Sequence, residues 1–360
     1  LAVINSFAAN SDYIFMEFLS NYGLFLAKTV TLLAALLAVV GFIATLTMRR
    51  RSAAPEHIEV KPINDHYRDI SDVLQHSMLH KNEAKKKRKA DKKARKAEEK
   101  KTSKQPDETR KRLFILDFQG DLRGSEVATL REEVTAVLLV AREQDEVLLR
   151  LESTGGMVHA YGLAASQLSR IREKKIKLTI AVDKVAASGG YLMACVGDRI
   201  LAAPFAIIGS IGVITQIPNF SRLLKKHDID YEQVTAGEFK RTVTMFGETT
   251  DKARQKLKEE VEDTHMLFKD FVKEQRPVVD LEKVATGEYW LGTRAHTLNL
   301  VDELCTSDDH LMSLRNEVDL YEVHYKIKQK FSDRVFSLFS RLQRNSLVNY
   351  TEPTQPPSLT

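Results

Sequence analysis

The sequence predicts an α/β protein with a mostly parallel sheet, preceded by one transmembrane helix and a charged linker. Three observations indicate this class: an uncharged run at residues 29–48, a strongly basic segment after it, and strand-like segments that alternate with helix-like ones from Arg112 onward. The 360 residues suffice for one large domain or two ordinary ones.

Residues 29–48 form the expected membrane anchor. At about 1.5 Å per residue they span about 30 Å, the thickness of a bilayer core. A buried soluble helix would carry a polar face, and a cleaved signal peptide would have basic residues before its apolar run. Here Arg49–Arg51 follow directly, as in a stop-transfer segment. We expect an uncleaved anchor after an N-terminal segment, 1–28, whose residues 1–15 read as an upstream extension.

Positive charge is concentrated after the anchor. The net charge is +5, but residues 81–112 hold 16 Lys/Arg and 6 Asp/Glu, a net of +10, so the remainder sums to −5. A mildly acidic body argues against nucleic acid as a partner. The linker, 49–111, is predicted to be a charged spacer, with attraction to anionic lipid as the alternative. The positive-inside rule puts the C-terminal part in the cytoplasm.

A folded domain is expected over residues 112–328, followed by an amphipathic, Pro-rich tail over 329–360. Ser125 is expected to cap its first helix. The strands are predicted at 112–118, 147–152, 177–182 and 199–203, and the helices at 125–144, 160–172, 190–196 and 250–275. This alternation favours right-handed βαβ units around a parallel sheet.

Two motifs lie at strand ends. In E-S-T-G-G-M (152–157) the two glycines permit a sharp turn with bare N–H groups, although the motif alone favours an ordinary turn. In V-A-A-S-G-G-Y (185–191), Ser188 is placed at the start of a helix, where N–H groups and the helix dipole favour negative charge. This arrangement is similar to a nucleophile elbow without being G-x-S-x-G, and a helix-capping serine is the alternative.

The residues alone do not decide which side chain would act as the base that activates such a serine. Ten histidines are present, none in a recognisable triad setting, and His159 reads as a surface or capping residue. A lysine can act as base if burial lowers its pKa from about 10.4. Lys240, in T-A-G-E-F-K-R-T, and Lys184, four residues before Ser188, are both candidates. The two cysteines, Cys195 and Cys305, form no metal-binding pattern, so no metal and no cofactor are expected.

The segment from about 112 to 305 resembles the signal peptide peptidase A family of Ser–Lys peptidases, and most of all its SohB-type inner-membrane members. The resemblance rests on S-T-G-G-M-V-H, D-K-V-A-A-S-G-G-Y, G-S-I-G-V and A-G-E-F-K-R-T, in that order. It implies a crotonase/caseinolytic-protease-like spiral of ββα units. It also implies a membrane-anchored serine endopeptidase of the inner membrane that hydrolyses membrane-derived or signal peptides. Family members with a periplasmic site oppose the orientation that the charges predict.

The resemblance also assigns roles to individual residues. The nucleophile falls on Ser188, and the general base on Lys240, 240 − 188 = 52 residues later, the interval of single-domain family members. The oxyanion hole falls on the N–H groups of Gly155 and Gly189, and Ser210 orients the lysine.

Two positions depart from the family pattern. Thr154 stands where proline is common, which would loosen the oxyanion turn slightly. Asn299 stands where glycine is usual, and asparagine is the next-best residue for a left-handed helix end. The expected partners are peptide substrates, membrane lipid and further copies of the chain, in a homo-oligomer larger than a dimer. The alternatives are a crotonase-like acyl-CoA enzyme without a covalent serine and a non-enzymatic membrane scaffold.

Overall fold

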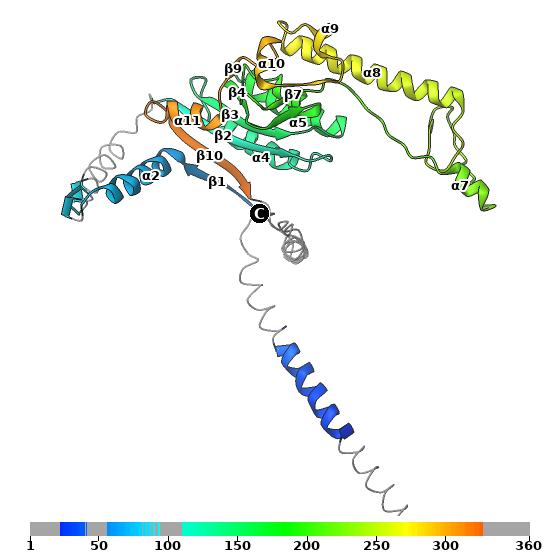
Figure 1. Cartoon of the computed structure of the whole chain (residues 1–360), viewed down its shortest axis with the longest axis horizontal. Coiled ribbons are helices and arrows are strands. Elements are labelled where there is room, and N and C mark those ends of the chain that lie inside the picture. The colour runs from blue at the N-terminus through cyan, green and yellow to red at the C-terminus, as the bar shows by residue number, and fades with distance from the viewer. Residues whose placement is uncertain are drawn as a thin grey trace, which may run out of the picture. The chain divides into compact units, whose positions relative to one another are not determined.

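The computed structural model describes residues 22–39, 41, 56–80 and 110–326, together with a few positions between 82 and 93. The chain divides into two units, one with residues 1–56 and 328–360 and the other with His57–Ile327. In the first unit, residues 22–39 are helical and unburied, and by length and composition they could cross a membrane (Figure 1). The predicted anchor, 29–48, overlaps this helix, and most of its remainder lies outside the described residues. So does the predicted tail.

The second unit is built on one ten-stranded sheet. Its main path runs β1-β10-β2-β3-β4-β6-β9, and β5, β7 and β8 branch from β3. Pairing is parallel except between β1 and β10 and between β7 and β8. The strands are β1 (His57–Pro62), β2 (Arg112–Gly120), β3 (Glu146–Ser153), β4 (Lys177–Val182), β5 (Val185–Ala187), β6 (Arg199–Ala202), β7 (Ile207–Gly209), β8 (Tyr289–Leu291), β9 (Glu303–Leu304) and β10 (Asp319–Lys326).

Helices cover both faces of the sheet. They are α2 (Ile63–Met78), α4 (Val127–Val140), α5 (Val158–Glu173), α6 (Gly189–Ala194), α7 (Ser221–Lys226), α8 (Asp251–Gln275), α9 (Leu281–Val284), α10 (Gly292–Thr297) and α11 (Ser307–Leu314). Along β2, Phe114 and Leu116 join the larger core with α4 and α5, while Leu113 and Ile115 join a smaller core with α2 and α11. This two-sided burial explains why the strands read as continuous apolar runs.

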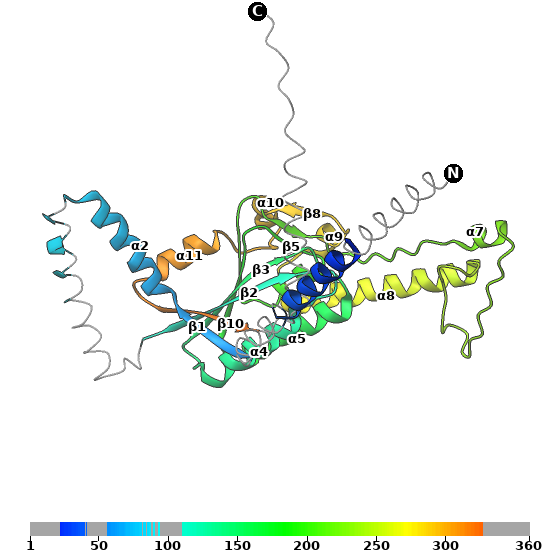
Figure 2. The ribbon, with the colours of Figure 1, turned by 90° about the horizontal axis from the view of Figure 1, so that it is seen from below.

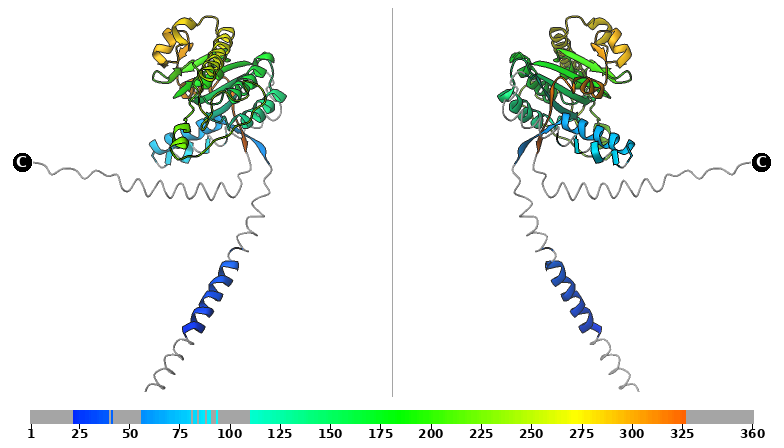
Figure 3. Two further views of the ribbon diagram at one scale, coloured as in Figure 1. Left: turned by 90° about the vertical axis from the view of Figure 1, so that its right-hand side faces the viewer. Right: turned by 90° about the vertical axis from the view of Figure 1, so that its left-hand side faces the viewer.

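The second unit begins at His57, before the boundary predicted at Arg112. Residues 57–78 were assigned to the linker, yet β1 pairs along its whole length with β10 (Figure 3). The side chain of Asn64, on α2, then bonds the carbonyl oxygens of Arg315 and Val318 and the N–H of Leu320. These elements could not be recognised from the sequence, because the residues around them have the composition of a linker and their partners lie more than 250 residues away.

Most predicted elements of the domain are observed within a few residues of their expected bounds, and the strand at 177–182 matches β4. The cap predicted for Ser125 is wrong, because the side chain of Ser125 donates to Asp121 and α4 begins two residues later. The mixed α/β sheet agrees with the expected class, whereas the crotonase-like spiral stays a prediction.

Residues 212–250, here called the arm, extend away from the sheet and carry α7 at their far end (Figures 1 and 2). All of these residues are described and none is buried. The buried residue of α8 is Val272, near its C-terminal end. At about 1.5 Å per residue, the arm therefore joins α8 about 30 Å from the contact that packs this helix on the core.

Candidate active site

Ser188 lies at the junction between β5 and α6 in an unusual backbone conformation. Its φ and ψ are 53° and −120°, and in the described part of the chain only five residues other than glycine have a positive φ. The N–H of Ser188 donates to the carbonyl oxygen of Gly209, 2.8 Å away, which ties the serine to the end of β7. Such strain persists only where the surroundings enforce it, and it is common at active sites.

The glycine turn after β3 lies directly beside this serine. Gly155 has a φ of +87°, and a Cβ atom there would fall 2.6 Å from the amide nitrogen of Gly189 and 2.8 Å from the Cβ of Ser188. The pairing of Ser153 with Ala186 brings the two strand ends together. The two sequence motifs therefore meet at one place, as a nucleophile and its oxyanion hole must.

The N–H groups around the glycine turn differ in whether they already have an acceptor within the chain. The N–H of Gly155 donates to the Oγ of Ser153, 3.0 Å away, so this group is already engaged. The N–H groups of Gly156 and Gly189 have no acceptor within residues 110–326. These two N–H groups are therefore unengaged, and the assignment of the oxyanion hole to Gly155 and Gly189 stays a prediction.

Of the remaining predicted residues, Ser210 lies next to Gly209, the residue that bonds the N–H of Ser188, whereas Lys240 lies on the arm. Ser210 follows β7 with a φ of 51°, and its Oγ donates weakly to the carbonyl oxygen of Gly287 at 3.4 Å. Lys240 is exposed on the arm, where its backbone N–H donates to the carbonyl oxygen of Gly237. Over residues 110–326, no hydrogen bond joins Lys240 to Ser188. The dyad of Ser188 and Lys240 stays a prediction.

The rival bases lie elsewhere. Lys184 points to solvent and pairs with Glu152 at 2.9 Å, with 71% of its side chain exposed. His159 is exposed on the first turn of α5. Asn299, by contrast, has a φ of 60° just beyond α10, which confirms the left-handed helix end expected of it.

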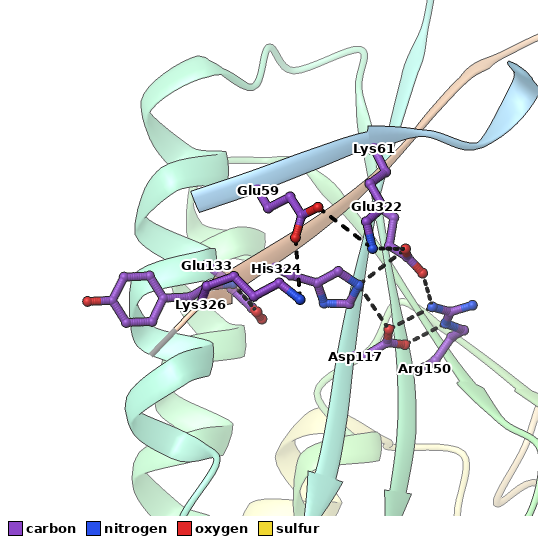
Figure 4. Close-up of polar contacts among 9 residues, drawn as sticks. Glu59, Lys61, Asp117, Glu133, Arg150, Glu322, His324 and Lys326 are labelled. Carbon is purple, nitrogen blue, oxygen red and sulfur yellow. Dashed lines mark hydrogen bonds and ion pairs between the residues drawn. The ribbon is translucent and has the colours of Figure 1, made fainter. Parts of the chain in front are cut away.

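One group of side chains has the composition of a metal site. Asp117, Glu322 and His324 converge on the face of β2 and β10 that carries the smaller core (Figure 4). The Nη2 of Arg150 lies 2.6 Å from Asp117 and 2.5 Å from Glu322. Although burial opposes the charged form, these bonds raise the pKa of Arg150. Because Arg150 already neutralises both carboxylates, a cation would have to displace its guanidinium group. We therefore interpret the cluster as a structural network of ion pairs.

The comparisons with known proteins decide the family. Residues 17–168 match the model described as peptidase family S49 N-terminal, and residues 170–321 match the model of peptidase family S49. The chain belongs to peptidase family S49. The resemblance inferred from the four motifs is therefore confirmed, and high-identity relatives assign the chain to the SohB type.

Two of these relatives are similar over nearly their whole length. "Probable protease SohB" of Haemophilus influenzae is 49% identical over 340 residues, covering 92% of this chain and 95% of the relative. The protein of the same name from Buchnera aphidicola is 47% identical over 319 residues, covering 89% and 93%. A mutant of the 1510-N membrane-bound stomatin-specific protease matches 57% of this chain and 84% of its own with 14% identity and a TM-score of 0.37. Family membership supports a peptidase over the acyl-CoA and scaffold alternatives.

Proposed function

We propose that this S49 peptidase is a serine endopeptidase, anchored in the membrane, with Ser188 as nucleophile and Lys240 as general base. The observation that supports this most is the left-handed backbone of Ser188, held between β5 and α6 against Gly155. A serine so placed has a helix N-terminus and unengaged N–H groups beside it, which suits a developing negative charge.

The base reaches the serine through assembly. The arm that bears Lys240 buries none of its residues, and it exposes apolar side chains such as Ile214 and Val234, which are 77% and 97% exposed. Exposed apolar surface of this kind favours docking on another protein surface. We propose that the arm of one copy packs beside the Ser188 of the next. We propose that this contact runs head to tail rather than being exchanged between two copies, so that its repetition closes a ring larger than a dimer.

In the assembled site the chemistry proceeds through an acyl-enzyme. Neutral Lys240 accepts the proton of the Ser188 hydroxyl while the Oγ attacks the peptide carbonyl carbon. The N–H groups of Gly156 and Gly189 stabilise the oxyanion, each by about 3–4 kcal/mol. The lysine ammonium then protonates the leaving amine, and water that has lost a proton to the same lysine hydrolyses the ester. Ser210, at the end of β7, orients the lysine.

The substrates proposed are membrane-derived or signal peptides. The unburied apolar helix at residues 22–39 would keep the peptidase next to the bilayer that releases such peptides. A single-pass topology in the bacterial inner membrane follows from this assignment. A reporter fused to the C-terminus would decide between the cytoplasmic side, which the arginines at 49–51 favour, and the periplasmic side.

Mixing two inactive variants tests both the dyad and its assembly. Ser188→Ala and Lys240→Ala chains should each be inactive when purified alone. After they are dissociated and reassembled together in equal amounts, about a quarter of wild-type peptidase activity should return, since that share of sites combines an intact serine with a neighbour's intact lysine. Full-length chains that stay monomeric at micromolar concentration, or mixtures that stay inactive, would contradict the proposal.

A further inference from the structure

A chain of four hydrogen-bonding groups lies beneath the glycine turn. The N–H of Gly155 donates to the Oγ of Ser153 at 3.0 Å, and this Oγ lies 2.6 Å from the Oη of Tyr161. The Oη of Tyr161 donates to the backbone carbonyl oxygen of Asp121 at 2.8 Å. The chain therefore connects the turn with α5 and with the loop after β2.

The direction of every bond in this chain is determined by its two ends. The carbonyl oxygen of Asp121 can only accept, so Tyr161 uses its single proton there. The bond between the two hydroxyls must then be donated by Ser153, whose oxygen accepts from the N–H of Gly155. With all donors committed, the N–H of Gly155 has a fixed direction.

Burial makes this arrangement rigid. The side chains of Ser153 and Tyr161 are 2% and 0% exposed, and burial raises the pKa of the Tyr161 hydroxyl. At Gly120, a Cβ atom would lie 2.4 Å from both hydroxyl oxygens, so the neighbouring strand packs closely against them and only glycine fits there. Buried polar groups of this kind are costly to leave unpaired, which disfavours any other arrangement of the turn.

The ring of Tyr161 also contacts the two residues whose N–H groups are unengaged. A Cβ atom on Gly189 would lie 2.5 Å from the Cγ of Tyr161, and one on Gly156 would lie 2.8 Å from its Cε2. One side chain thus holds the turn through its hydroxyl and supports both donor residues through its ring.

We propose that Tyr161 and Ser153 are positioning residues for the oxyanion hole. By holding the N–H of Gly155, they fix the orientation of the turn, so that Gly156 and Gly189 present their N–H groups to the substrate carbonyl beside Ser188. This inference rests on the proposed serine mechanism. Neither residue touches substrate, so both act on the rate through the geometry of the turn.

The test compares Tyr161→Phe, Ser153→Ala and the double variant in the full-length protein. Each single variant should lower kcat by about 10- to 100-fold and change KM by less than about twofold, since a shift of about 1 Å in a donor has effects of this size. The double variant should lose no more than the worse single one, because the two residues act through one chain of bonds. Inhibition by a peptide aldehyde, which forms an oxyanion on the serine, should weaken by the same factor as kcat.

Tyr191→Phe is the matched control. Tyr191 is equally buried, and its hydroxyl bonds the carbonyl oxygen of Leu300, away from the turn. It should lose comparable thermal stability and keep wild-type kcat. Unchanged kcat in both Tyr161→Phe and Ser153→Ala, or an equal loss in Tyr191→Phe, would overturn the inference. A wild-type protein that hydrolyses no peptide and is not labelled at Ser188 by a fluorophosphonate would overturn the proposed function, and this inference with it.

Discussion

Gly155 and Ser188 lie so close together that a Cβ atom on the glycine would fall 2.8 Å from the Cβ of the serine. The two residues come from different strand ends, joined where Ser153 of β3 pairs with Ala186 of β5. A change in the backbone position of either turn therefore displaces the other.

Gly155→Ala should abolish peptide hydrolysis, with a loss in kcat of about 100-fold or more. The new methyl group would press on the Ser188 Cβ and the Gly189 nitrogen, in addition to the strain of a positive φ. Gly287→Ala is the control for backbone strain alone, because Gly287 has the same φ of +87° and nothing within 4 Å of its Cβ position. Steady-state kinetics and thermal unfolding of both variants would check this; equal losses of activity would contradict it.

Among the lysines, Lys240 should be essential and Lys184 dispensable. Lys240→Arg should remain folded and inactive, because a guanidinium group stays protonated and cannot accept the serine proton. Lys184→Ala should keep activity, since it removes only an exposed ion pair with Glu152. Peptide turnover would be compared with wild type, and with Ser188→Ala as the inactive reference. Activity in Lys240→Arg would show that a residue other than Lys240 acts as the general base.

Ionisation of Glu133 should lower the free energy of unfolding in mildly alkaline solution relative to mildly acidic solution. Burial raises the pKa of this carboxyl from 4.5 to about 7, despite a bond from the N–H of Tyr325. Its stabilising contribution is therefore complete below about pH 4.5 and is lost as the pH rises through about 7. A shift of this size corresponds to roughly 3 kcal/mol.

Glu133→Gln should accordingly remove that part of the pH dependence. Thermal unfolding at pH 5 and pH 8 should show a smaller fall for this variant than for wild type, whatever the cost of the amide itself. Glu132→Gln, its exposed neighbour on α4, should behave like wild type. A pH profile identical in all three proteins would rule out a buried titrating carboxyl.

Truncation should distinguish the two possible starts of the folded unit. A chain that begins at His57 keeps the β1–β10 ladder and the contacts of α2, and should unfold at the temperature of the full-length protein. A chain that begins at Arg112 leaves β10 as an exposed edge, and its unfolding temperature should fall by about 5 °C or more. In the full-length chain, Asn64→Ala should cost about 1–3 kcal/mol, whereas the exposed Gln75→Ala should cost little.

The amino-acid sequence by itself determined the local features of the molecule. Runs of β-branched and aliphatic residues predicted strands such as β4, and the small residues around Ser188 predicted a strand–helix junction. The left-handed conformation of Asn299 was expected because asparagine stands where the family pattern has glycine. Each of these depends on neighbours a few residues away, so propensity and periodicity suffice.

The tertiary structure decided which segments and side chains lie next to one another. Only the pairing of β1 with β10 shows that part of a charged, linker-like segment belongs to the sheet. Only the packing of Tyr161 on Ser153 shows that the Gly155 N–H is already occupied. Lys240, which motif spacing assigned to the serine, lies on an arm without a buried residue. The first relationship joins residues more than 250 positions apart, and the others depend on how the chain packs in three dimensions, which local propensity does not contain.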